Sequence, residues 1–577
     1  RIYAKEGNMT LGTDNKTIDG FNIKRIEKII KKLKTESYYP KPSRRVYIPK
    51  KNGGSRPLGI PSFEDKLVQE VLRMMLEAIY EPNFNNSSHG FRPERSCHTA
   101  LIQVKQKGSG ASWVIEGDIK GFFDNIDHEI MLNILKKKIK DGRIIETVRR
   151  FLKAGYFEFK KVHNSITGTP QGGVISPILA NIYLNELDTF MEKICLKEST
   201  IKRRKGDNPI YKRLSWQRWE ARKTGNYKNA DEILKNMRNI SSVNTMDPEF
   251  IRVNYVRYAD DFLVLIDGNK ELAQNIKSKI RVFLKKNLKL ELSEEKTLIT
   301  HIRTERVRFL GYEIQKMQEN EAITKCINGQ KKRSINGGIS LLVPRDIIQT
   351  KMQKFTKNGK PVHVPERIND PVLNTLIKFN GEIRGLYNYY RLATDVSKKL
   401  NVFKRTHYVS LLKTIARKEK RSLKQILTKY GVSVDRRLGT GTRKIFGITY
   451  KTKEEKKTMI YFNEPICKNE IPYKGKESNG IIGTLYSPRY QILARYNAKK
   501  CELCGLESND QKKFEIHHIR KLKDIKQKYS KRGSKIPEWV LKMVAINRKT
   551  LVVCKKCHIE IHQGKMRKSL KNIKIQK

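Results

Sequence analysis

Three aspartates lie at the ends of strand-like segments and could hold metal ions together. Asp118 closes an apolar run at residues 113–119, and Asp260 and Asp261 lie side by side between two β-branched runs within residues 251–268. Carboxylates gathered at one edge of a sheet repel one another and lose hydration, so they stay ionised only where cations lie between them. Two-metal phosphoryl transfer has this requirement: one Mg²⁺ activates the attacking hydroxyl and a second stabilises the leaving pyrophosphate. A surface hairpin turn would also accommodate the Asp pair, and the presence of Asp118 favours the metal site.

A reaction on a nucleoside triphosphate also needs positive charge to hold the phosphates. Residues 46–61 read V-Y-I-P-K-K-N-G-G-S-R-P-L-G-I-P, which predicts two strands around an Asn-Gly-Gly turn. Lys50 and Arg56 lie on this hairpin, and their residue types make them the candidates for gripping a triphosphate.

The carboxyl-terminal part holds a second group of metal-binding residue types. Two C-x-x-C pairs are found there: Cys501, Cys504, Cys554 and Cys557. Four thiolates in two such pairs suit one tetrahedral Zn²⁺, and the duplication argues against a single redox C-x-x-C. Four histidines crowd into the same tract: His517, His518, His558 and His562. The last two are four residues apart and would share one face of a helix.

Composition indicates the kind of partner. The 577 residues carry a formal net charge of +61, which excludes an ordinary metabolic enzyme as the default and predicts a large polyanionic partner. Hydrophobic residues at 38% are too many for a disordered basic tail, so the charge belongs to folded surfaces. Apolar runs are far shorter than the ~20 residues that span a bilayer. Lys and Arg recur along the whole chain, which favours nucleic acid over a membrane surface. The first residue is Arg1, and we expect the native amino terminus to lie upstream.

Periodicity places the candidates on a mixture of helices and strands. One predicted helix, residues 65–80, has five apolar residues at helical spacing on its expected buried face: Val68, Leu72, Met75, Leu76 and Ile79. A rigid Gly- and Pro-rich loop at 168–177 leads into a second helix, and residues 197–244 form a polar, basic and helical insertion. Long basic helical stretches follow from about residue 335. They include aromatic rings and guanidinium groups that are suited to binding RNA: Arg384, Tyr387, Tyr389, Tyr390 and Arg391. For each tyrosine, packing in the core is an equally open role.

Six short motifs occur in an informative order: R-P-L-G-I-P, H-G-F-R-P-E-R-S-C-H, D-I-K-G-F-F-D, P-Q-G-G, Y-A-D-D and R-F-L-G-Y. Each motif is weak alone, whereas the ordered set is specific. With these motifs the chain resembles a group II intron-encoded reverse transcriptase and maturase of the lactococcal type. The similarity extends from the I-D-G-F segment at residues 18–21 to the final residues.

The resemblance implies a role for each polymerase candidate. It places two Mg²⁺ on the three aspartates named above and the triphosphate on the two basic residues of the hairpin. Phe123 would be the aromatic gate that excludes a ribose 2′-hydroxyl, and Pro170 and Gln171 would line the nucleotide pocket. Lys296 would assist pyrophosphate departure. Plain core packing for Phe123 and a solvated role for Lys296 remain the alternatives.

The Cys and His tract resembles an HNH endonuclease, in which a ββα hairpin holds one hydrolytic metal. By that resemblance His518 would be the general base that activates water. A catalytic Mg²⁺ would be contacted by three others: His517, His558 and His562. Thr550 takes the place of the family's central Asn, with Asn547 three residues earlier. Zinc-stapled DNA binding without cleavage is the alternative.

These features imply an α+β multidomain protein built around a right-hand polymerase. We expect four parts: fingers and palm at 1–335 with the basic insertion at 197–245, an α-helical thumb or X domain at 336–437, a small basic DNA-binding module at 438–498, and the ββα-metal HNH domain with its four-cysteine zinc site at 499–577. The implied function combines RNA-directed DNA polymerase, maturase and HNH DNA endonuclease in target-primed intron retrohoming.

The resemblance also implies partners and a setting. The partners are a group II intron RNA, a DNA target duplex and dNTPs; a homodimer is compatible with the resemblance, and a membrane is not expected. The setting is the bacterial cytoplasm, with action at the nucleoid, and an organelle is also open. A splicing-only RNA-binding maturase with vestigial catalytic centres is the alternative function, which the intact acids and histidines disfavour. A second alternative is an HNH homing nuclease with a degenerate remainder.

Overall fold

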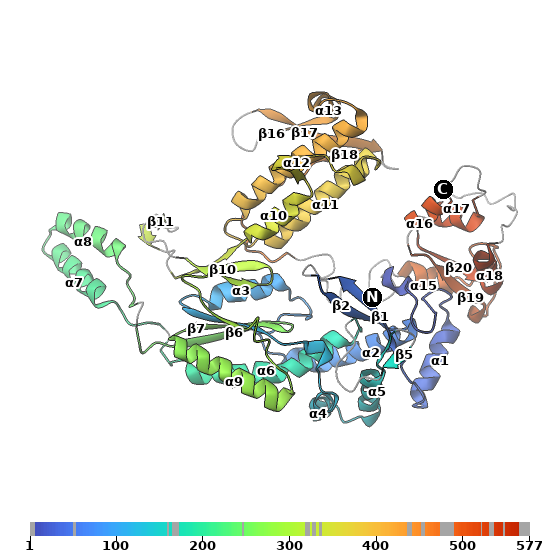
Figure 1. The fold of residues 1–577 in the computed structure, drawn as a ribbon, viewed down its shortest axis with the longest axis horizontal. Helices are drawn as coiled ribbons and strands as arrows, with labels where there is room; N and C mark the ends of the chain where they lie inside the picture. Colours follow the sequence, from blue (N-terminus) through green and yellow to red (C-terminus); the bar gives the residue numbers. More distant parts are fainter. Residues whose placement is uncertain are drawn as a thin grey trace.

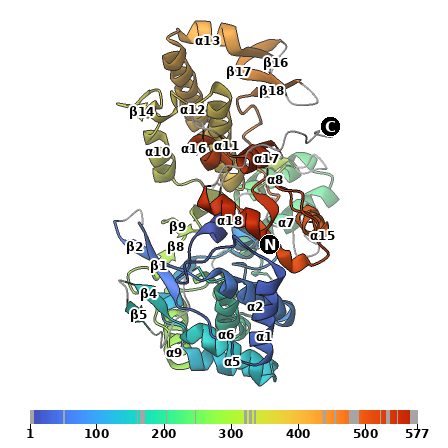
Figure 2. The ribbon, with the colours of Figure 1, turned by 90° about the vertical axis from the view of Figure 1, so that its right-hand side faces the viewer.

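The computed structural model describes residues 6–49, 53–158, 161–163, 172–202, 204–244, 247–317, 323–325, 331–333, 337–435, 441–451, 456–473, 490–520, 522–529, 536–545 and 548–564. Fingers and palm form the base in Figure 1, a helical thumb rises above them, and the carboxyl-terminal domain lies beside the amino-terminal segment. Figure 2, turned by 90°, again shows the carboxyl-terminal domain next to the amino-terminal segment.

The palm is a four-stranded antiparallel sheet in the order β6-β7-β3-β8. Its strands are β3 (Trp113–Asp118), β6 (Arg252–Tyr258), β7 (Asp261–Asp267) and β8 (Leu298–His301). Asp118 lies opposite Asp261 in the β3–β7 register, and Tyr258 lies opposite Asp261 in the β6–β7 register. The predicted pair of strands within residues 251–268 is therefore confirmed, with a tight turn between them.

Both faces of the palm sheet are covered, which explains the continuous apolar run of β7. Phe262, Val264 and Ile266 join one core with helices α2 (Phe63–Tyr80), α4 (His128–Lys138), α5 (Gly142–Lys153), α6 (Ser176–Glu198) and α9 (Lys270–Leu288). Leu263 and Leu265 join a second core with α3 (Cys97–Lys107) and the sheet β13-β10-β9. The strands of that sheet are β9 (Val307–Phe309), β10 (Tyr312–Lys316) and β13 (Ile339–Leu342).

The predicted buried face of helix α2 is partly wrong. Its Val68, Leu72 and Leu76 are buried, whereas Met75 and Ile79 are exposed. Polar residues such as Gln69 are buried in their place. Gln69 Oε1 accepts a hydrogen bond from the Val174 N–H at 2.7 Å, so α2 also contacts the chain that leads into α6. The helix is therefore positioned by polar contacts as well as by its apolar stripe.

The fingers contain the predicted hairpin as part of a sheet in the order β2-β1-β4-β5. Its strands are β1 (Ser43–Pro49), β2 (Ser55–Ile60), β4 (Tyr156–Glu158) and β5 (Lys161–His163). The basic insertion forms an antiparallel pair of helices, α7 (Pro209–Lys223) and α8 (Tyr227–Asn239), which projects from the palm at the left of Figure 1.

The thumb is built from α10 (Arg345–Gln353), α11 (Val372–Tyr390), α12 (Val396–Glu419) and α13 (Leu423–Tyr430). A sheet in the order β16-β17-β18 packs on these helices, with strands β16 (Gly431–Asp435), β17 (Thr442–Lys451) and β18 (Lys456–Ile460). Phe446 and Phe462 are buried in the core that contains α11 and α12. The sheet crosses the expected boundary at residue 437, so the first part of the expected DNA-binding module packs as part of the thumb.

The thumb tyrosines mainly connect parts of the protein. Tyr389 donates its hydroxyl to Leu310 O at 2.7 Å, and Tyr390 donates to Gly311 O at 3.1 Å. Tyr387 is buried, and its hydroxyl donates to Cys467 O at 3.1 Å. These bonds tie helix α11 to the palm-side strands and to the chain after β18, while Tyr389 stays 38% exposed.

The carboxyl-terminal domain has its own core around the hairpin β19 (Phe514–His518) and β20 (Thr550–Cys554), followed by α18 (Lys555–Gln563). Helices α15 (Tyr490–Asn497), α16 (Leu522–Lys528) and α17 (Glu538–Ala545) complete it. Among the described residues, no helix is both long and apolar enough to cross a bilayer.

Candidate active sites of the palm and the carboxyl-terminal domain

The three predicted aspartates meet at one edge of the palm sheet. Asp118 ends β3 opposite Asp261, the first residue of β7. Asp260 lies in the turn, where Ala259 adopts a left-handed φ of 57° that lets the chain reverse between the strands. Burial, together with the charges of Asp260 and Asp118, raises the pKa of Asp261 to about 7. Burial and Asp118 also raise the pKa of Asp260. Carboxylates that resist ionisation together are fitted to hold divalent cations.

A buried arginine that the sequence pattern missed supports this turn. Arg257 on β6 is fully buried and donates through Nη1 to Ala259 O at 2.8 Å. Its Nη2 donates to Asp188 Oδ2 on α6 at 2.6 Å. An arginine within an alternating strand is expected to face solvent, and only the acidic partner on a distant helix indicates otherwise.

Basic residues approach the same carboxylates. Lys296 Nζ lies 3.0 Å from Asp118 Oδ2, so the amino group reaches the edge where the carboxylates meet. The positive charges of Arg56 on β2 and of Lys296 oppose the rise in the Asp260 pKa, which places both near that carboxyl. Phe123 is half-buried beside Phe122, with ring centroids 5.2 Å apart. The remaining predicted nucleotide contacts lie outside the described residues: Lys50, Pro170 and Gln171.

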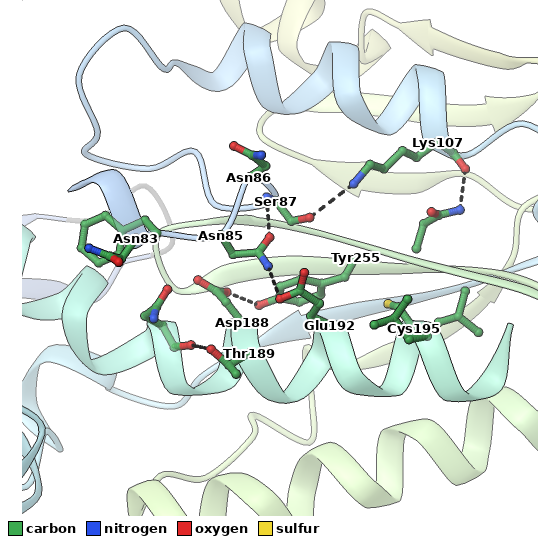
Figure 3. Close-up of a pocket in the computed structure, with 15 residues that line it drawn as sticks. Asn83, Asn85, Asn86, Ser87, Lys107, Asp188, Thr189, Glu192, Cys195 and Tyr255 are labelled. Carbon is green, nitrogen blue, oxygen red and sulfur yellow. Dashed lines mark hydrogen bonds between the residues drawn. The ribbon is translucent and has the colours of Figure 1, made fainter. Parts of the chain in front are cut away.

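A polar pocket lies apart from these carboxylates, between the chain at 83–87, α6 and β6 (Figure 3). Asp188 contributes to its wall and accepts the Tyr255 hydroxyl at 3.0 Å. Asn85 Nδ2 donates to Glu192 at 3.1 Å. Through Asp188 and Tyr255, the wall of this pocket is continuous with the Arg257 network.

Four cysteines converge in the carboxyl-terminal domain. Cys501 Sγ lies 3.7 Å from Cys557 Sγ, and Cys504 Sγ lies 3.7 Å from Cys554 Sγ. All four sulfurs lie within 4.8 Å of one another. A tetrahedral metal with bonds of about 2.3 Å separates its sulfurs by roughly 3.8 Å, so the spacing fits the predicted zinc site.

The predicted histidines also converge, and a fourth residue joins them. His517, His558 and His562 offer ring nitrogens that lie within 4.8 Å of one another and of a carboxylate oxygen of Asp19. Asp19 was absent from the sequence prediction. On its own, burial would lower the pKa of His558, but the carboxylates of Asp19 and Glu515 outweigh it and raise the pKa to about 9. The cluster therefore attracts positive charge, which a proton or a metal cation supplies.

His518 has the geometry of a neutral base. Its Nδ1 lies 2.9 Å from Ile516 O, and since a carbonyl only accepts, Nδ1 carries the proton and Nε2 keeps its lone pair. Burial lowers the pKa of His518 to about 4, so the ring is neutral at pH 7. Thr550 opens β20, and Asn547 lies outside the described residues.

Family comparisons agree with this arrangement. Residues 48–213 and 226–314 match the family of reverse transcriptases (RNA-dependent DNA polymerases), residues 339–466 match type II intron maturases, and residues 501–558 match AI2M/AI1M-like HNH endonucleases. The maturase match thus extends past residue 437, like the thumb packing. Reverse transcriptase and HNH domains are metal-dependent enzymes that act on nucleic acids.

Whole-chain comparisons give the family. The chain is 40% identical to the group II intron-encoded protein LtrA of Lactococcus lactis subsp. cremoris, over 98% of this chain and 93% of that protein. It is 31% identical to the putative COX1/OXI3 intron 2 protein of Saccharomyces cerevisiae, over 98% of this chain and 64% of that protein. A solved telomerase from Candida albicans aligns at 12% identity and a TM-score of 0.37, over 70% of this chain and 59% of that one, a likeness too weak to bear on the fold. The chain belongs to the group II intron-encoded proteins, and it is a reverse transcriptase with a type II intron maturase domain and an HNH DNA endonuclease domain.

Proposed function

We propose that the two centres act in sequence on one DNA target during intron retrohoming. The HNH centre cuts one strand of the duplex, and the palm extends the new 3′-hydroxyl by copying the intron RNA with dNTPs. The observation that supports this most is that one chain brings together both three palm carboxylates and a cluster of three histidines. A splicing-only maturase has no use for either.

In the palm, Asp118, Asp260 and Asp261 would hold two Mg²⁺, because their charges converge at one sheet edge. When bound, these ions activate the primer hydroxyl and neutralise the leaving pyrophosphate. Lys296, beside Asp118, would donate a proton to the departing pyrophosphate. These assignments explain why a lysine lies within the carboxylate group.

Around the incoming nucleotide, Arg56 and Lys50 of the finger hairpin would hold the triphosphate. Phe123 would face the sugar and exclude a 2′-hydroxyl, with Pro170 and Gln171 lining the pocket. Different elements would thus contact the two parts of the nucleotide. The fingers would bind the triphosphate through charge, and the turn after β3 would select the sugar through shape.

In the nuclease, neutral His518 would take a proton from the attacking water. A Mg²⁺ held by His517, His558 and His562 would stabilise the charge that develops on the phosphate. A Zn²⁺ bound by the four cysteines would cross-link strand β20 and the start of α18 to the loop at 501–504, and so would stabilise the hairpin.

The maturase function would use the basic surfaces of the thumb and insertion. The insertion also exposes Trp216 and Trp219, which are suited to stacking on unpaired bases of the intron RNA. We assign fingers and palm to residues up to about 335, the thumb to the described residues beyond it through at least Ile466, and the nuclease to residues from 499 onward, in one bacterial nucleoid-associated ribonucleoprotein.

A target-primed synthesis assay tests the proposal. Protein reconstituted with its intron RNA is given a labelled duplex target, dNTPs and Mg²⁺, and cDNA joined to the cut strand is measured. His518→Ala should abolish this product on intact duplex and leave synthesis intact on a duplex supplied with the nick already made. If the pre-nicked duplex fails to restore synthesis, cutting and copying are not sequential steps of one pathway.

A further inference from the structure

A segment from the polymerase end of the chain lies along the nuclease hairpin. Phe21 forms an antiparallel bridge with Ile516 of β19, in which the Ile516 N–H donates to Phe21 O at 3.2 Å. Asn22 donates through Nδ2 to Glu515 Oε1 at 3.2 Å. Further contacts join Ile23 to Tyr496 and Glu27 to Lys512. Residues 19–23 thus extend the edge of the hairpin and dock helix α1 (Ile23–Lys34) beside it.

This docking carries the carboxylate of Asp19 into the histidine cluster. Asp19 Oδ1 lies 3.2 Å from His517 Nδ1 and 3.2 Å from His558 Nε2. Asp19 Oδ2 lies 2.7 Å from His562 Nε2. The His518 backbone N–H also donates to Oδ1 at 2.7 Å, which fixes the carboxylate, and the Asp19 side chain is only 12% exposed.

The arrangement of ring nitrogens and carboxylate oxygens fits a cation bound at the centre of the cluster. His558 Nδ1 lies 2.7 Å from Glu515 Oε2, an arrangement that directs Nε2 towards a metal. A neutral His558 carries one ring proton, and Nδ1 uses it to donate to Glu515. Its Nε2 then faces two further groups without a proton: Asp19 Oδ1 at 3.2 Å and His562 Nε2 at 3.3 Å. Neither ring nitrogen of His517 has a well-formed hydrogen bond to the part of the chain that the structure describes. Neighbouring ligands of an octahedral Mg²⁺, bound at about 2.1 Å, are roughly 3.0 Å apart, close to the observed spacings.

We infer that Asp19 is a fourth protein ligand of the nuclease metal, supplied by the polymerase end of the chain. The inference rests on the proposed metal-binding role of the three histidines. A carboxylate oxygen shifts the preference of a three-imidazole site towards Mg²⁺ and Mn²⁺. The nuclease centre is therefore complete only while its hairpin is docked on residues 19–23, which couples DNA cleavage to the lobe that copies the RNA.

The residue after Asp19 explains how the segment comes so close. Gly20 has a left-handed φ of 70°, and a Cβ built there would lie 3.3 Å from His558 Cε1. A side chain at this position would meet both backbone strain and the ring of a ligand. Gly20→Ala therefore offers a way to displace the carboxylate without removing it.

Mn²⁺ binding to the full-length protein tests the inference. The parent carries Asp260→Asn and Asp261→Asn, which remove the palm site, and free Mn²⁺ is followed by electron paramagnetic resonance. Asp19→Asn, which keeps size and loses charge, should weaken Mn²⁺ binding at least about 10-fold, and Gly20→Ala should weaken it in the same direction. Glu27→Ala, which removes only the exposed ion pair with Lys512, should leave the affinity within about twofold. Primer extension by the same variants in a wild-type palm reports that each chain is folded.

The outcomes separate the inference from the proposed site. Loss of Mn²⁺ binding in His558→Ala with unchanged binding in Asp19→Asn would overturn the role of Asp19 and keep the histidine site. Unchanged binding in both variants would overturn the histidine site itself. Unchanged binding with faster DNA cleavage in Asp19→Asn would also overturn the inference, because Asp19 would then occupy the place of the substrate phosphate.

Discussion

Arg257 and Asp188 form a completely enclosed ion pair behind the β6–β7 turn of the palm, with Nη2 2.6 Å from Oδ2 and neither side chain exposed. Asp188 is held in turn by the Tyr255 hydroxyl, and Arg257 holds the carbonyl of Ala259. Burial on its own would lower the pKa of Arg257, but the adjacent carboxylate keeps the guanidinium charged and raises it. The pair therefore connects α6 to the turn that carries Asp260.

Removing one partner should be costly. Asp188→Ala leaves Arg257 charged and buried without its counter-ion, and the free energy of unfolding should fall by about 3–5 kcal/mol. Glu186→Ala on the same helix breaks only the exposed ion pair with Lys137 and should cost less than about 1 kcal/mol. Urea unfolding followed by hydrogen exchange at the palm strands measures both. Equal effects of the two substitutions would contradict a structural role for the enclosed pair.

Lys296 should matter for chemistry and little for stability. Its amino group touches Asp118 from an exposed position, so Lys296→Ala should slow single-nucleotide incorporation by about 10–100-fold with an unchanged melting temperature. Lys289→Ala, which removes another exposed lysine with an acidic partner, should leave incorporation unchanged. A rate in Lys296→Ala equal to that of wild type would assign Lys296 to the solvated alternative.

The thumb should weaken in acid through Glu382. Burial would raise the pKa of this carboxyl, but hydrogen bonds from His407 and Arg367 outweigh it and lower the pKa to about 2. Its contribution is complete above about pH 4.5 and is lost as the pH falls towards 2. Burial also lowers the pKa of His407, so protonation of the unfolded chain removes further stability below about pH 6.5.

Hydrogen exchange in α11 and α12, compared at about pH 7, about pH 4.5 and about pH 3, measures this loss. Glu382→Gln should reduce thumb stability at pH 7 by about 1–2 kcal/mol, a value that allows for the exposed third of the side chain, and should flatten the dependence below pH 4.5. The exposed Glu366→Gln serves as the control. A Glu382→Gln chain with the wild-type acid response would exclude this carboxyl as the source.

Zinc removal should affect the nuclease domain alone. The four sulfurs lie in the core of that domain, which is separate from the two polymerase cores. Elemental analysis should find one zinc per chain in wild type and none in Cys504→Ala, which should lose DNA cleavage and keep primer extension. Cys467→Ser, at an exposed cysteine of the thumb, should retain both metal and cleavage. A full zinc content in Cys504→Ala would refute the four-cysteine assignment.

Local patterns predicted that three aspartates lie at strand ends of the palm. The β-branched runs around Asp260 and Asp261 and the run before Asp118 each indicated a strand end, and antiparallel pairing brings such ends together. The two C-x-x-C pairs and the i, i+4 histidines were equally informative because their spacing is short. Each of these signals is local, because it depends on the residues of one strand end or of one short motif.

Long-range partners were not predictable from local patterns. Asp19 meets the backbone of His518 across 499 residues, within a loop that has no metal-binding pattern of its own. Arg257 lies at a position where the local strand pattern predicts a solvent-facing residue. Its buried partner belongs to α6, so the local pattern gives no sign of the ion pair. Met75 and Ile79 fit the helical period of α2 but are exposed. The face that is buried instead contains Gln69, which bonds to Val174 in a distant part of the chain. In each case a contact between distant elements overrides the local pattern.

The central claim is that one chain carries two separate metal-dependent centres, and one preparation assayed for two products tests it most directly. Wild type, Asp261→Asn and His518→Ala are compared for cDNA synthesis on a primed RNA template and for cleavage of a target DNA strand, with Mg²⁺ present in both. Asp261→Asn should lower synthesis by at least about 100-fold and leave cleavage unchanged, whereas His518→Ala should lower cleavage by a similar factor and leave synthesis unchanged. Loss of both products in either variant, or of neither product in both variants, would contradict the account.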